Sequence, residues 1–167
     1  MSFLDSWQAL SDTPWATAIH ESDLVFPALE SVHVLALMLM AGTIAVADLR
    51  LLGLVLPGVP AAEVERRVTP TTWFGFAVMA ATGGLLFASE AGDLRRNPAF
   101  LVKVCLLAAA GLNVLAFQIL ARPALERTPA GAAAPPAARV IAALSLAIWA
   151  CVIVAGRAVA YFTHKGG

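Results

Sequence analysis

The chain has few charged residues, and this scarcity argues against a soluble domain. Asp, Glu, Lys and Arg make up 13% of its 167 residues, whereas soluble domains carry about 25%. Acidic and basic residues balance to a formal net charge of +0, so nothing in the charge favours nucleic-acid binding. The length suits one bundle without a separate soluble domain.

Two further absences narrow the chemistry. The only cysteines, Cys105 and Cys151, lie in apolar runs without CxxC or Cys/His spacing. We interpret them as small core residues rather than as a disulfide or a zinc site. The first 23 residues contain no Lys or Arg, although a signal peptide needs a basic beginning. We therefore expect the first apolar segment to be an uncleaved membrane span.

Long apolar runs are what the sequence does contain. The run from Val34 to Ala47 has no charged residue, and the surrounding segment, Leu24 to Leu56, is long enough to cross a bilayer core of roughly 30 Å. With three similar runs it predicts an all-α fold, an integral membrane antiparallel four-helix bundle in one domain, residues 1–167. The expected elements are a short interfacial helix over about 3–18 and spans over about 24–54, 70–88, 98–121 and 139–162.

Local signals place the ends of these spans. Thr69-Pro70 and Asn97-Pro98 each pair an N-cap residue with a proline, which favours the start of the second and third spans. The expected links are a polar helix over 61–68, a charged turn over 90–96 and a Pro/Ala-rich loop over 122–138. Glycines in the second span permit close approach of a neighbouring backbone or a flat ligand; they are Gly75, Gly83 and Gly84.

Lys and Arg in the links set the expected orientation, because basic residues are retained on the inner side of a membrane. Six of them fall in or beside the first and third links, against three in the N-terminal segment, the second link and the C-terminal segment. We expect a multi-pass protein of the bacterial inner membrane with both termini on the outer, periplasmic side.

Four ionisable residues share one depth in this topology. Glu30 and His33 lie near the outer end of the first span, three residues apart and therefore on one helix face. Lys103 lies a similar distance inside the third span, and Arg157 lies in the last turns of the fourth. Ionisable groups in a span indicate a functional site, because each costs free energy unless it faces protein, water or a cofactor.

The inner half shows no comparable group. Asp48 and Arg50 lie near the end of the first span, and Asn113 and Gln118 are the strongly polar side chains expected within the inner half. The sequence therefore predicts its site in the outer half only.

The outer cluster has two interpretations. In the structural one, Glu30 neutralises Lys103 or Arg157, and His33 is a polar neighbour. In the ligand-binding one, His33 is a metal ligand, because histidine on an apolar helix is the usual axial ligand of membrane haem, and Lys103 or Arg157 meets the propionates. A single Glu30-x-x-His33 motif does not make a di-iron site, which needs two copies.

His33 is the only histidine within an expected span, which excludes two haems held by histidine pairs within one chain. One haem b is compatible with three ligand sets: His33 with Lys103, His33 with a surface histidine, or His33 alone. The catalytic residues, if the protein is an oxidoreductase, are not indicated by any motif.

Three segments carry a family resemblance: ESVHVLALMLMAGTIAVADLRLLG, NPAFLVKVCLLAAAGLN and VAGRAVAYF. From Trp15 to Phe162 the chain resembles an uncharacterised family of small bacterial four-helix membrane proteins. Its first-helix histidine and third-helix lysine are also similar, more distantly, to the CopD copper-resistance membrane domain and to HemJ-type protoporphyrinogen oxidase. The HemJ resemblance implies haem binding and activity at His33 and Lys103.

Our first expectation is a b-type haem protein that serves electron transfer or oxidises a hydrophobic substrate at the outer leaflet. Its partners would be the lipid bilayer, a redox partner or quinone, and a second copy in a homo-oligomer, with no nucleic acid. The alternatives are a cofactor-free subunit of a membrane complex and CopD-like copper handling. Copper(I) favours soft ligands, for which the candidates are Met38, Met40 and Met79.

Overall fold

The computed structural model of the chain describes residues 3–94, 97–129 and 131–165, and within these ranges it contains helices and no strand. Two short helices, α1 (Phe3–Ser11) and α2 (Pro14–His20), come first. The long helices are α3 (Val25–Leu51), α4 (Ala61–Leu94), α5 (Pro98–Ala116) and α7 (Pro136–Lys165). A π-helical turn, η1 (Phe117–Ala121), joins α5 to α6 (Arg122–Glu126).

The long helices confirm the expected all-α membrane bundle. Four helical stretches of the described chain are long and apolar enough to cross a bilayer: 25–51, 61–94, 98–126 and 136–159. Many large apolar side chains on them are exposed, among them Leu35, Phe74 and Ile119. A bundle whose outer surface is this apolar belongs in lipid, since water would not solvate it.

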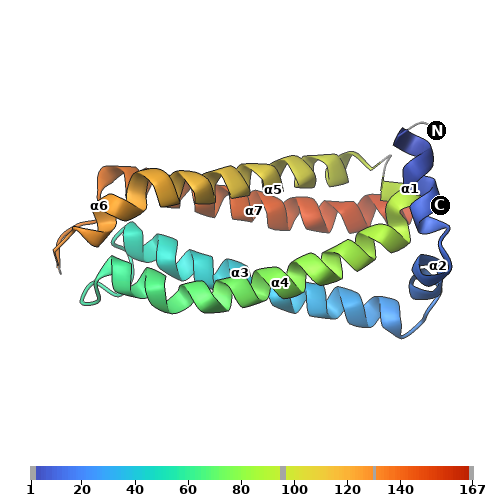
Figure 1. Cartoon of the computed structure of the whole chain (residues 1–167), viewed down its shortest axis with the longest axis horizontal. Helices are drawn as coiled ribbons and strands as arrows, with labels where there is room; N and C mark the ends of the chain where they lie inside the picture. The colour runs from blue at the N-terminus through green and yellow to red at the C-terminus, as the bar shows by residue number, and fades with distance from the viewer. Residues whose placement is uncertain (1–2, 95–96, 130, 166–167) are drawn as a thin grey trace.

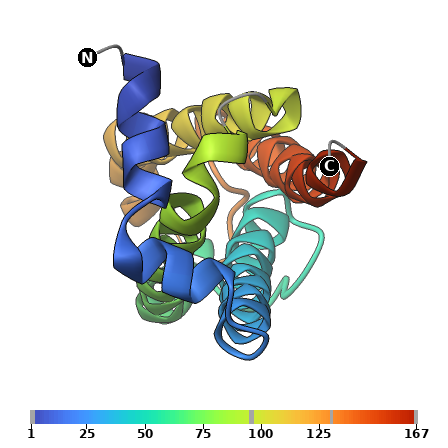
Figure 2. The ribbon, with the colours of Figure 1, turned by 90° about the vertical axis from the view of Figure 1, so that its right-hand side faces the viewer.

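The helices form two pairs that run the length of the molecule. α3 packs along α4 and α5 packs along α7, and α3 also contacts α7 (Figure 1). α1 and the end of α7 lie at one end of the bundle, which we call the terminal end. The α3–α4 link and α6 lie at the opposite, distal end (Figure 1). Figure 2, viewed from the terminal end, shows α1 and α2 lying across the ends of the long helices.

The N-terminal segment forms two helices rather than the single one expected over 3–18. Thr13 has extended backbone angles and precedes Pro14 at the start of α2. Because the residue before a proline is disfavoured in the helical region, the chain breaks there. Trp7 of α1 then packs edge-on against Phe87 of α4 and Phe100 of α5, at centroid distances of 5.2 and 6.3 Å.

The second span also begins differently from the expectation. α4 is continuous from Ala61 to Leu94 with Pro70 inside it, so Thr69 is not an N-cap. Proline removes one backbone donor and leaves the carbonyl four residues earlier, that of Arg66, without its helical partner. The side chain of Arg66 is exposed, which shows that this turn is accessible and that the unpaired carbonyl costs little.

The third span begins as predicted and ends later. The side chain of Asn97 caps α5 by accepting hydrogen bonds from the amides of Ala99 and Phe100, at 3.0 and 3.3 Å. The helix then continues to Glu126 through η1, where a loop was expected from residue 122 onward. Pro123 explains the π-helical turn, because a proline ring does not fit against the carbonyl four residues earlier in a regular α-helix.

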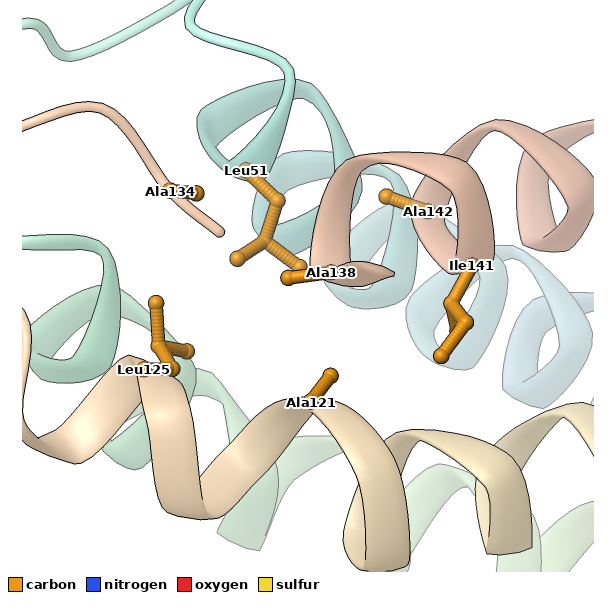
Figure 3. Packing of buried hydrophobic residues seen from close by; sticks show 7 residues of the cluster. All are labelled: Leu51, Ala121, Leu125, Ala134, Ala138, Ile141 and Ala142. Atoms are coloured by element: carbon orange, nitrogen blue, oxygen red, sulfur yellow. The ribbon is translucent and has the colours of Figure 1, made fainter. Parts of the chain in front are cut away.

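Two apolar clusters hold the bundle together. Between α3 and α4, Met40 and Met79 pack together with Ala36, and Gly75 allows the two backbones to approach, since a Cβ there would lie 3.2 Å from the amide nitrogen of Met40. The second cluster closes the distal end (Figure 3). We call it the distal cluster; it consists of Leu51, Ala121, Leu125, Ala134, Ala138, Ile141 and Ala142.

Candidate functional site

His33 is held in place by α4. Its Nδ1 lies 3.0 Å from the hydroxyl oxygen of Thr82, which is itself buried. The ring also interacts with the backbone carbonyl of Met79, which lies 3.3 Å from the same hydroxyl. The edge of the imidazole ring is therefore held by two polar groups on the neighbouring helix.

These contacts favour one tautomer of the neutral ring. The Thr82 hydroxyl has a single hydrogen and two carbonyls of its own helix within reach, those of Val78 and Met79 at 2.8 and 3.3 Å. When it donates to either carbonyl, its oxygen accepts a hydrogen bond from Nδ1 of His33. A neutral imidazole that carries its proton on Nδ1 has a free lone pair on Nε2, which is the form that binds a metal.

Gly83 makes room for this ring. A Cβ at residue 83 would lie 2.9 Å from Cε1 of His33 and 3.4 Å from its Nδ1. At Gly84, one residue later, a Cβ would meet nothing within 4 Å. Among the glycines of this helix, Gly75 thus serves backbone packing, Gly83 accommodates the histidine, and a Cβ at Gly84 would have no neighbour within 4 Å.

Lys103 of α5 comes to the same region from the other helix pair. It is half-buried and close enough to His33 for a direct electrostatic interaction. Its ammonium lies near Gly156 of α7, where a Cβ would be 3.8 Å from Nζ. The histidine and the lysine that the sequence places at one depth therefore do come together, each beside a glycine of a neighbouring helix.

Glu30 and Arg157 do not join them. Both side chains are exposed. The ion pairs of the described chain are Arg66–Glu63, Arg67–Glu63 and Arg122–Glu126, each within one helix. Because none of these pairs contains Glu30, Lys103 or Arg157, the structure gives no support to the hypothesis that Glu30 neutralises Lys103 or Arg157.

The donor chemistry at His33 fits a haem better than a free metal ion. No group of three or more His, Cys, Asp or Glu residues suited to a metal ion occurs in the described part of the chain. A haem needs only one or two axial ligands from the protein, because the porphyrin supplies the others. His33 offers one such nitrogen, and Lys103 offers a cation for a propionate.

The other candidate ligands lie elsewhere. His20 packs against the ring of Phe26 at a centroid distance of 5.7 Å and lines a polar pocket of about 230 Å³ with Glu90 and Asp93. Met38 is exposed. Met40, two turns after His33 on α3, packs with Met79 in an apolar cluster. The side chain of His164 falls outside the described residues.

The sequence analysis missed one polar pair in the distal half. Asp48 of α3 accepts a hydrogen bond from the side chain of Ser145 of α7, and both residues are buried. Asn113 of α5 lies close by, because its side-chain amide donates to the carbonyl of Ile141 at 3.3 Å. A signal was present, since Asp48 and Ser145 lie at similar distances from the distal ends of their spans.

The chain belongs to a family of unknown function, DUF6644, which it matches over residues 24–162. That range includes His33, Lys103 and the four long helices except the last three residues of α7. No curated protein and no solved structure matches the chain.

Proposed function

We propose that this member of a family without an assigned function binds one b-type haem in the terminal half of its bundle, with His33 as an axial ligand. The observation that carries the proposal is the contact between Nδ1 of His33 and the Thr82 hydroxyl, which favours the tautomer that binds a metal through Nε2. Thr82 contacts Nδ1 at 3.0 Å, and with the proton on Nδ1 the Nε2 lone pair is available to iron. The distant resemblance to HemJ-type oxidases and the CopD domain supports the same residue.

Lys103 is proposed to bind a haem propionate. It lies in the same region as His33, and an ammonium in a span is stabilised by an anionic partner. Arg157 and Glu30, whose side chains are exposed, are proposed to act only at the entrance to the site. A bound haem would supply one-electron chemistry, for electron transfer or for the oxidation of a hydrophobic substrate.

The test is the visible spectrum of protein purified in detergent from cells with ample haem supply. We expect a Soret band in the wild type and its loss in His33→Ala, with the protein still folded and monodisperse. Val34→Ala, on the exposed side of the same helix, is the matched control and should keep the band. Lys103→Ala should shift the spectrum or the potential and retain part of the haem. A colourless wild type would refute the proposal, as would full haem content in His33→Ala.

A cofactor-free role is the alternative that one observation favours. A second inter-helix hydrogen bond, between the hydroxyls of Thr43 and Thr72 at 2.8 Å, joins α3 and α4 without any ligand-binding atom. The His33–Thr82 contact would then have the same packing role. CopD-like copper handling would instead use the packed pair Met40 and Met79. Metal analysis of the same colourless protein distinguishes these two alternatives.

The location proposed is the bacterial inner membrane, with both termini outside, and with a quinone or redox protein as partner and a homo-oligomer as the assembly. Single cysteines at exposed residues 93 and 132, in a background lacking Cys105 and Cys151, test the orientation. An impermeant thiol reagent added to intact cells, with the outer membrane permeabilised, should label residue 93 and not residue 132. The reverse pattern would invert the topology.

A further inference from the structure

Asp48 is a buried carboxyl group with one oxygen atom that has no partner. Its residue is 7% exposed, and Ser145 supplies its side-chain hydrogen bond. Among the described residues, Oδ2 of Asp48 is the buried side-chain polar atom that lacks any hydrogen-bond partner. Buried polar atoms are almost always satisfied, so this oxygen requires an explanation.

Within the part of the chain that the structure describes, no charged side chain is found to compensate Asp48. Arg50, on the same helix, directs its Nε to the carbonyl of Val59 at 2.6 Å. On α7 the nearest basic residue along the chain is Arg139, which is exposed. On α4, Glu65 accepts from Thr69. The one electrostatic partner found for Asp48 within the described chain is the neutral hydroxyl of Ser145.

The pair lies inside the bundle, beside the distal cluster. Leu51 lies one turn beyond Asp48 on α3, and Ala142 lies one turn before Ser145 on α7; both belong to the distal cluster (Figure 3). An ionised carboxylate in such surroundings is strongly disfavoured unless it is paired. The carboxyl group therefore needs either a proton or a bound cation.

The number of oxygen ligands available at Asp48 decides between a proton and a bound cation. A hard metal cation takes about six or more oxygen ligands, whereas this place offers one carboxyl group and one hydroxyl. Asn113, the next polar side chain of the region, uses its amide to bind the carbonyl of Ile141. A proton needs a single oxygen, and Oδ2 is the oxygen without a partner.

We propose that Asp48 is a proton-binding site in the distal half of the membrane, where Oδ2 takes up one proton and releases it to water while Ser145 fixes the other oxygen. Uptake converts the carboxylate to the neutral acid with no other bond broken. The site lies 15 residues after His33 on α3, or about 22 Å along the helix. It does not depend on haem.

Infrared spectroscopy of the protein in lipid tests the proposal. At neutral pH we expect the carbonyl-stretch band of a protonated carboxylic acid in the wild type, and its loss in Asp48→Asn. The band should move when the protein is transferred to D₂O, because a proton that exchanges with water is replaced by deuterium. Glu126→Gln, which changes an exposed carboxylate paired with Arg122, is the control and should leave the band unchanged.

Ser145→Ala keeps the test decisive if Asp48→Asn does not fold, since loss of this hydrogen bond should shift the band in frequency. Three results would overturn the proposal. One is a spectrum that neither Asp48→Asn nor Ser145→Ala changes. Another is a band that disappears on addition of sodium, which would indicate a cation site. The third is a band that stays in place after prolonged exposure to D₂O, which would indicate a permanently protonated structural group.

Discussion

His33 and Asp48 lie on the same helix, and their surroundings differ in an instructive way. Each has one polar partner on a neighbouring helix, Thr82 in the first case and Ser145 in the second. The group that remains without a partner is the lone pair of a neutral ring nitrogen at His33 and a carboxyl oxygen at Asp48. The first costs little to leave free, whereas the second is costly unless it is protonated. The same arrangement therefore leaves one residue ready for a ligand and the other in need of a proton.

His33 and Asp48 also differ in how deeply they are buried. The ring of His33 is half-buried and lies against Gly83, which has no side chain. Asp48 is enclosed by protein and lies one turn from the distal cluster. In the terminal half, the missing side chain of Gly83 makes space for the ring of His33, whereas Asp48 and Ser145 in the distal half are both buried. This difference makes the glycine, rather than the histidine alone, the element that distinguishes the two sites.

The largest expected effect comes from filling that space. Gly83→Ala places a Cβ 2.9 Å from the His33 ring and should lower the free energy of unfolding in detergent by about 1–3 kcal/mol, as overpacking does. The ring must turn away from Thr82, so haem content should fall too. Gly84→Ala is the matched control, with open space at its Cβ, and should stabilise the helix by up to about 1 kcal/mol.

Denaturant titration of the two alanine variants measures this contrast. Equal effects at residues 83 and 84 would show that the ring does not lie against α4, and the comparison between the two halves of the bundle would lose its basis.

The next effect concerns the distal half. Ser145→Ala removes the hydrogen-bond donor to Asp48 and should destabilise the protein by about 1–2 kcal/mol, because a buried polar group loses its partner. Asp48→Asn replaces a neutral acid by a neutral amide and should change stability by less than about 1 kcal/mol. If Asp48→Asn instead stabilises the protein by several kcal/mol, the native group is an uncompensated carboxylate.

A smaller effect is expected at the partner of His33. Thr82→Val keeps the shape of the side chain and removes the hydroxyl that holds Nδ1 at 3.0 Å. The expected loss is about 1 kcal/mol of stability, with a shift in the reduction potential of bound haem. Thr82→Ser restores the hydroxyl and should restore the potential. A potential that is unchanged in Thr82→Val would exclude this residue from positioning the imidazole.

Hydropathy and depth account for the part of this structure that the sequence predicts. The spans and the Asn97 cap follow from apolar runs and local signals, and His33 and Lys103 meet because they occupy one depth. The depth of a residue in the membrane does not tell which side of its helix the residue lies on. Neighbouring residues on a helix differ by about 100°, which separates Gly83 from Gly84 and turns Glu30 and Arg157 outward. Asp48 and Ser145 also lie at similar depths, but depth alone does not show that their side chains face each other, so their pairing needed coordinates.

The smallest expected effect is a coupling energy that serves as the reference for the Asp48–Ser145 pair. The hydroxyls of Thr43 and Thr72 form a 2.8 Å hydrogen bond between α3 and α4. One of them donates in this bond, and the other donates within its own helix; the carbonyls within reach are those of Met40 for Thr43 and Val68 for Thr72. Because each hydroxyl keeps a local partner when the other is removed, a double-mutant cycle with Thr43→Val and Thr72→Val should give a coupling of about 0.6 kcal/mol, the usual size for such bonds in membranes. The same cycle with Asp48→Asn and Ser145→Ala should give a larger value, because the Asp48 carboxyl has no second partner in the described chain. Equal couplings would mean that Asp48 and Ser145 are ordinary packing residues, and that the orphaned oxygen is satisfied in the membrane by water.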